Sequence, residues 1–125
     1  MKIFTVEEAN ELLPAVRARL ERIQRLYARI GGFRESAKAA AIASEFGGGM
    51  EGGPDYVRAL YEVGKLTTDL HDLGVQLKDY SRGLIDFPCM LDDRVVLLCW
   101  QIGDGDEIEW WHEVEAGFAG RQPLW

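Results

Sequence analysis

The first third of the chain carries apolar residues at alternating spacings of three and four. From residue 13 onward these positions are Leu13, Val16, Leu20, Ile23, Tyr27 and Ile30. This spacing predicts an amphipathic helix with a coiled-coil-like seam. Thr5 followed by Glu8 is a capping box that predicts where the helix begins. Gly31-Gly32 predicts its end, and the Ala-rich residues 33–46 could add a further helical turn or two.

A second helical pattern begins after Pro54. Its apolar positions are Tyr56, Leu60, Val63, Leu66, Leu70 and Leu73. Between the two patterns, residues 47–54 contain five Gly and one Pro, which predicts a flexible connector over about residues 47–53. Neither helix alone can bury its apolar seam. We therefore expect an antiparallel helical hairpin over about residues 5–73, within one domain.

From Gly74 onward the pattern changes to short strands separated by turns. Residues 75–78 form a short strand or the helix end, and residues 84–90, 94–101 and 107–114 each have the composition of a strand. The tail over residues 117–123 is expected to be a structured loop. The whole chain, residues 1–125, is thus predicted to be a single α+β domain. A long antiparallel helical hairpin precedes a short antiparallel sheet of three to four strands, over about residues 75–125.

The turn positions predict which residues pair across this sheet. A hairpin turn at Asp104-Gly105 pairs Cys99 with Trp110 and Leu97 with His112. A three-residue turn at 91–93 pairs Met90 with Arg94 and Asp86 with Leu98. In this register Asp86 and Glu113 share one face, and His112 lies on the other. A slip of one residue would change the faces.

Both faces of the predicted sheet are largely apolar. One face should cover the helical hairpin, and a second subunit is the economical cover for the other. We therefore expect a homodimer, with Trp100 and Trp111 as candidate interface residues.

Composition and charge narrow the class of protein. The chain is 47% hydrophobic with thirteen aromatic residues, which excludes a disordered protein, and it has two cysteines, too few for a disulfide scaffold. No apolar run is long enough to span a membrane, and the first residues lack the apolar stretch of a signal peptide, so we expect a cytoplasmic protein. The net charge of −7 argues against nucleic-acid binding, although the arginines of the first helix could bind phosphate or form a solvated face.

Candidate chemistry gathers in the C-terminal half. Asp86, His112 and Glu113 have the residue types of a divalent-metal site, and Asp86 with Glu113 could act as an acid–base pair. The alternatives are a hydrogen-bonded core histidine and structural ion pairs. The segment Gly117–Arg121 has the glycines and the guanidinium of an anion-binding loop, or of a tight turn whose arginine pairs with an acidic neighbour. The ligand-binding candidates are Lys78, Asp79, Asp86, Glu113 and Arg121.

Several segments, in this order and spacing, resemble a bacterial family known as domain-of-unknown-function family 2203. They are Phe4–Pro14, Gly74–Asp79, Gly83–Pro88, Cys99-Trp100, Trp111–Glu113 and Gly117–Arg121. The resemblance covers almost the whole chain. It implies a small prokaryotic protein with no established activity, so it supports the fold and the compartment but no mechanism.

Two function classes follow from these patterns. The first is a non-enzymatic, oligomerising protein-interaction module. The alternative is a protein, enzymatic or not, that binds a small ligand or a divalent metal, with its site near Asp86, Glu113 and Arg121. No nucleic-acid or membrane partner is expected, and no cofactor is predicted.

Overall fold

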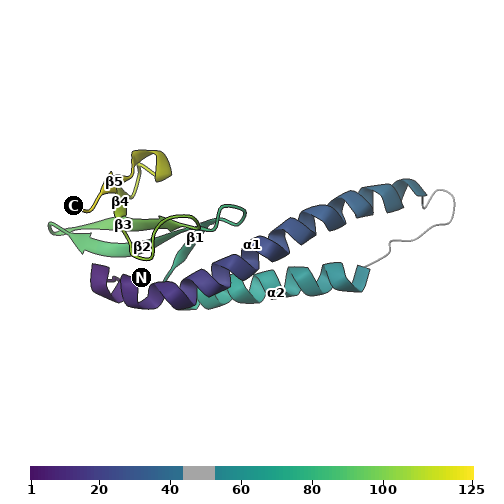
Figure 1. The fold of residues 1–125 in the computed structure, drawn as a ribbon, viewed down its shortest axis with the longest axis horizontal. Helices are drawn as coiled ribbons and strands as arrows, with labels where there is room; N and C mark the ends of the chain where they lie inside the picture. The colour runs from purple at the N-terminus through teal and green to yellow at the C-terminus, as the bar shows by residue number, and fades with distance from the viewer. Residues whose placement is uncertain (44–52) are drawn as a thin grey trace.

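A computed structural model describes residues 1–43 and 53–125 as two helices followed by a five-stranded antiparallel sheet (Figure 1). The elements are α1 (Val6–Ala43), α2 (Gly53–Asp72), β1 (Gln76–Asp79), β2 (Leu84–Leu91), β3 (Arg94–Gln101), β4 (Trp110–Glu113), the 3₁₀ turn η2 (Phe118–Gly120) and β5 (Gln122–Pro123). The strands follow one another across the sheet in chain order. The predicted α+β fold is confirmed. The sheet has one strand more than the three to four expected, because part of the tail pairs with β4.

Helix α1 begins where its capping box predicts. The backbone N–H of Thr5 donates to Glu8 Oε1 at 2.9 Å, and the N–H of Glu8 donates to Thr5 Oγ1 at 3.0 Å. The predicted end at Gly31-Gly32 is wrong, since the helix continues to Ala43. A glycine costs about 1 kcal/mol in a helix, and contacts such as that between Phe33 and Tyr56 help to hold the helix beyond this point. The predicted connector over 47–53 lies outside the described residues except for Gly53, which begins α2.

The two helices pack against each other along slightly different seams from those predicted. Leu26 is buried in α1, in place of Tyr27. On α2, Ala59 is buried, whereas Leu60 is 43% exposed. Ala59 packs with Leu26 and Ile30 of α1 in one buried cluster, where its small side chain allows the two helices to approach each other.

The sheet packs one face onto the helices. Its inner face carries Ile85, Phe87, Leu98 and Trp100, which join one core with α1 and with the residues around Leu70. Figure 1 shows the sheet lying along the N-terminal half of α1, while the rest of the hairpin extends beyond it. No described helix has both the length and the apolar character that a membrane crossing requires.

The turn between β2 and β3 sets the register of the sheet. Asp92 and Asp93 alone form the turn, with φ of 50° and 63°, and Leu91 pairs with Arg94. Two successive positive φ angles define the hairpin turn whose twist matches that of the strands. The predicted three-residue turn was therefore wrong by one residue, and Asp86 pairs with Cys99 instead of Leu98.

The register of β3 with β4 is confirmed at both predicted pairs, Cys99 with Trp110 and Leu97 with His112. The connection is nevertheless longer than the predicted two-residue turn. Strand β4 begins only at Trp110, and residues 102–109 form a loop. The corrected register of β2 and the confirmed register of β4 together place Asp86, Cys99 and His112 on the same face of the sheet.

The middle of the outer face of the sheet is buried by the chain itself, whereas Met90 near its edge is 52% exposed. Leu84, Leu97 and Cys99 are at most 7% exposed, beneath the segment that contains η2. The expected reason for a second subunit, an uncovered apolar sheet face, therefore does not apply to this part of the sheet. Trp100 is 1% exposed in the inner core, where its indole N–H donates to the carbonyl of Gly105, and it is not available as an interface residue. Trp111 is half-buried against the same core.

Candidate metal site

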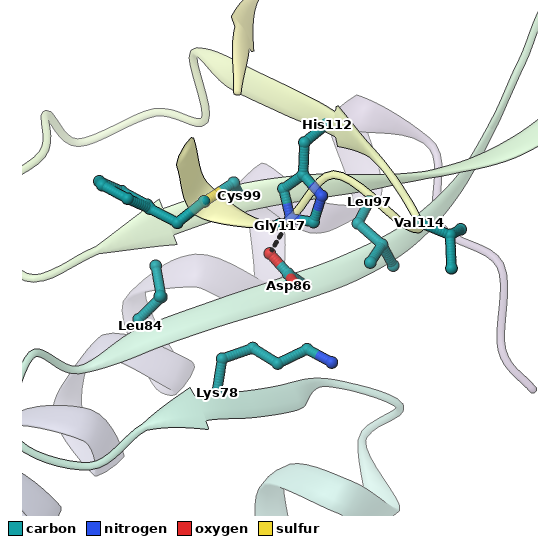
Figure 2. A pocket seen from close by; sticks show the side chains of 9 residues that line it. Lys78, Leu84, Asp86, Leu97, Cys99, His112, Val114 and Gly117 are labelled. Atoms are coloured by element: carbon teal, nitrogen blue, oxygen red, sulfur yellow. Dashed lines mark hydrogen bonds and ion pairs between the residues drawn. The ribbon is translucent and has the colours of Figure 1, made fainter. Parts of the chain in front are cut away.

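A cavity of about 170 Å³ lies on the outer face of the sheet, under the C-terminal segment. Residues of the strands β1, β2, β3 and β4 line it together with Val114 and Gly117 (Figure 2). Phe118 of η2 also lines it. Its other lining residues are Lys78, Leu84, Asp86, Leu97, Cys99 and His112. The polar groups of this cavity come from adjacent strands, so the sheet register alone decides whether they meet.

Three of these side chains form a compact buried cluster. Asp86 on β2 lies directly opposite Cys99 on β3, and His112 on β4 reaches across β3 toward the same carboxylate. An Asp86 oxygen, Cys99 Sγ and a His112 ring nitrogen all lie within 4.8 Å of one another. Each of the three residues is at most 2% exposed.

The hydrogen bonds of His112 fix the direction of its ring. Nδ1 lies 2.7 Å from the backbone carbonyl of Glu113, and Nε2 lies 3.0 Å from Asp86 Oδ1. A carbonyl oxygen only accepts hydrogen bonds, so Nδ1 carries a hydrogen and Nε2 faces the cluster. A second proton must then lie between Nε2 and Oδ1 for that contact to be a hydrogen bond.

Burial changes the acid strength of the other two groups. The pKa of the Asp86 carboxyl lies above its ordinary value because burial raises it by more than the nearby His112 lowers it. Burial, with the Asp86 carboxylate as the next cause, raises the pKa of Cys99 to about 11. At neutral pH Cys99 is therefore a thiol, not the reactive thiolate that nucleophilic catalysis requires.

Arg121 closes one side of the cluster, and its charge is already paired. Its guanidinium nitrogens lie 3.2 Å from both carboxylate oxygens of Asp104. The same guanidinium stacks on Trp110 and Phe118, with 4.5 and 4.7 Å to the ring centres. Of the two alternatives for this segment, the tight turn with a paired arginine is the one that the structure contains.

The remaining predicted ligand-binding residues do not lie together at the cluster. Glu113 lies on the opposite face from Asp86 and forms a salt bridge with Arg94. Asp79 accepts hydrogen bonds from its own turn, chiefly from the N–H of Arg82, and these lower its carboxyl pKa. Lys78 does line the cavity.

The predicted metal set Asp86, His112 and Glu113 is thus brought together only in part. Cys99 takes the place of Glu113, because the one-residue correction of the β2–β3 register puts the thiol opposite Asp86. The pair of adjacent aspartates at 92–93, both tolerant of positive φ, was the signal in the sequence that could have revealed this register.

The fold and the cluster define a small α+β protein with a buried site of three different donors on its sheet. The chain belongs to the family described as "Uncharacterized conserved protein (DUF2203)", whose model matches residues 2–124. No curated protein and no solved structure matches it.

Proposed function

We propose that this protein binds a divalent transition-metal ion, with zinc as the preferred ion, through Asp86, Cys99 and His112. One observation carries the proposal: oxygen, sulfur and nitrogen donors from three neighbouring strands converge within 4.8 Å in a buried site. Thiolate and imidazole together favour zinc over magnesium or calcium, which prefer oxygen ligands.

The separations of the donors suit a tetrahedral ion. Zinc lies about 2.0 Å from nitrogen and oxygen and about 2.3 Å from sulfur, so its ligand atoms are roughly 3.3–3.6 Å apart. The Asp86–His112 distance of 3.0 Å is close to this range, and the 4.8 Å limit on the whole cluster leaves only small side-chain rotations to complete the site.

The surroundings of His112 support the same function. Histidines that bind metals usually donate their other ring N–H to a carbonyl or carboxylate, which orients the ring. Here Nδ1 makes this contact with the Glu113 carbonyl and leaves Nε2 directed at the cluster.

The buried negative charge of Asp86 also supports metal binding. An ionised carboxylate that is 2% exposed is costly without a strong partner. A dication bound by the carboxylate of Asp86 and the thiolate of Cys99 would give a neutral centre. Three protein ligands leave a fourth position for water or a ligand, which is the coordination of catalytic rather than structural zinc sites.

Cobalt(II) binding tests the proposal directly. The protein should take up one Co²⁺ and develop the visible absorption of tetrahedral Co²⁺ together with a sulfur-to-cobalt charge-transfer band in the near ultraviolet, and Zn²⁺ should abolish both. Cys99→Ser should remove the charge-transfer band, whereas Cys89→Ser should keep it, because Cys89 is a buried thiol on the inner face of the same sheet.

A second pair of variants tests the histidine. His112→Gln should weaken zinc binding at least about 100-fold, since loss of mere supporting groups already costs 10- to 100-fold. Glu113→Gln, one residue along, should leave it unchanged because its carboxylate pairs with Arg94. Wild-type protein that binds neither ion, or equal loss in both members of a pair, would refute the site.

Self-association is a second candidate function, and we propose it for a different surface. Val57, Leu60 and Tyr61 are 63%, 43% and 74% exposed on one side of α2. Beside them, residues 58, 62, 65 and 69 form a row of alternating charge, Arg–Glu–Lys–Asp. In an antiparallel pair of α2 helices from two copies, each positive residue of this row faces a negative one.

Sedimentation velocity over a range of concentrations tests this candidate. A reversible dimer should form, and Tyr61→Glu should dissociate it. Trp125→Glu should not, because Trp125 is an equally exposed aromatic residue at the far end of the chain, 76% exposed. A monomer at all concentrations up to 100 µM, taken as roughly the upper end of useful affinity, would exclude the dimer.

A further inference from the structure

The cavity beside Asp86, Cys99 and His112 has a cationic rim on an otherwise acidic protein. The chain carries a net charge of −7, yet Lys78 lines the cavity, and Arg82 and Arg121 flank its wall residue Phe118. Local positive charge in an acidic protein is a mark of a site for anions.

Lys78 is the cation placed to reach a ligand. It is exposed, it lies on β1, and its side chain is on the other side of Asp86 from His112 (Figure 2). Within residues 1–43 and 53–125 it takes part in none of the salt bridges. Arg121 differs from it, because its charge is already matched by Asp104.

The rest of the cavity wall is apolar. Leu84, Leu97, Val114 and Phe118 surround the space next to the cluster. Phe118 is held in place by the guanidinium of Arg82, 4.1 Å from its ring centre, and by Arg121 on the same ring. The volume of about 170 Å³ is similar to that of an apolar cavity that accepts benzene, about 150 Å³. Together these features select a compact ligand with a hydrocarbon part.

The proposed metal centre sets the charge of this ligand. Zinc with one carboxylate, one thiolate and a neutral imidazole has no net charge. Among the described cations near the cavity, Lys78 lines it directly, whereas Arg82 and Arg121 lie behind Phe118, so Lys78 is the positive group left beside the open position. A monoanion balances that charge, whereas a phosphate dianion would not.

From this geometry we infer that the cavity binds a small monocarboxylic acid about the size of benzoic acid. Its carboxylate occupies the fourth coordination position beside Lys78, and its hydrocarbon part lies against Leu84, Leu97 and Phe118. This inference rests on the proposed metal site. It adds the ligand class, which the donor cluster alone does not specify.

The experiment titrates the cobalt-loaded protein with benzoate and follows the visible spectrum of the ion. Benzoate should change the spectrum with saturation. Benzamide, which is neutral and of the same shape, should bind at least about tenfold more weakly, as should acetate, which lacks the apolar part. Inorganic phosphate is the probe for a purely electrostatic site and should not compete at the concentrations that saturate benzoate.

Lys78→Gln provides the matched variant. It should weaken benzoate binding by about tenfold or more while the affinity for Co²⁺ stays unchanged. Lys38→Gln, at an exposed lysine on α1 outside both proposed sites, should change neither quantity. Benzamide binding as tightly as benzoate, phosphate competing with it, or no effect of Lys78→Gln would overturn the inference. These failures differ from failure of the metal site, in which the wild-type protein shows no cobalt spectrum at all.

Discussion

The Asp86–His112 contact should be a strongly coupled pair even when no metal is present. Both side chains are 3% exposed, and their hydrogen bond of 3.0 Å is therefore largely shielded from solvent. Breaking such a pair by removing one partner leaves an uncompensated buried group, whereas replacing both with apolar residues removes that cost. A double-mutant cycle with leucine at both positions separates these cases.

The magnitudes follow from the burial. His112→Leu removes the nearest partner of the Asp86 carboxyl, leaving only the weaker influence of Lys78 and Cys99, and should lower the free energy of unfolding by about 3–5 kcal/mol. Asp86→Leu leaves the imidazole Nε2 without a partner and should cost about 1–3 kcal/mol. The double variant should lie within about 2 kcal/mol of wild type, because leucine suits the neighbouring Leu84 and Leu97. The coupling free energy is then about 2 kcal/mol or more.

Urea denaturation in the presence of EDTA, followed by circular dichroism, measures all four proteins without metal. For a chain of 125 residues, 1 kcal/mol corresponds to a midpoint shift of about 4 °C, so thermal unfolding gives an independent check. The Glu113 carbonyl loses its donor in both proteins that lack His112, so this loss cancels in the cycle. Additive effects of the two single variants would refute the buried pair as described.

Three further predictions concern two turns of the sheet and its two cysteines. Asp93→Gly should raise the free energy of unfolding by about 0.5–1 kcal/mol in urea denaturation, because glycine accepts the φ of 63° without strain. A lower free energy of unfolding would contradict the turn type. Gly83→Ala should lower the free energy of unfolding by about 1–3 kcal/mol in the same assay, since the added Cβ would meet Ile102 Cδ1 at 2.4 Å and φ is +61°. A neutral effect would contradict this conformation of the turn and its contact with Ile102. Ellman's reagent at pH 8 should label neither cysteine of the folded, metal-free protein within minutes, because Cys99 has a pKa of about 11 and Cys89 is also buried. Both cysteines should react after unfolding, and rapid labelling of Cys99 in the folded protein would contradict its protonated, buried state.

The helical hairpin shows which features of the fold local sequence patterns can predict. The spacing of apolar residues and the capping box at Thr5 were sufficient for the type, order and start of the helices. The end of α1 was not predictable from Gly31-Gly32, because the cost of two glycines is small and helix pairing over residues 26–33 outweighs it. Propensity decides a helix end only where tertiary contacts do not.

At the site, the candidate residue types and two of the three donors, Asp86 and His112, could be predicted from the amino-acid pattern alone. The Asp104-Gly105 turn signal also predicted the β3–β4 register, although the loop there is longer than a two-residue turn. That Cys99 takes the place of Glu113 follows from how the strands pair in the folded protein. The physical reason is the two-fold alternation of a strand: one residue more or less in the turn at Asp92-Asp93 moves every side chain of β2 to the other face relative to β3. Short-range preferences at that turn are worth fractions of a kcal/mol, whereas burial of both sheet faces, inward on α1 and outward under the C-terminal segment, selects one register for the whole sheet.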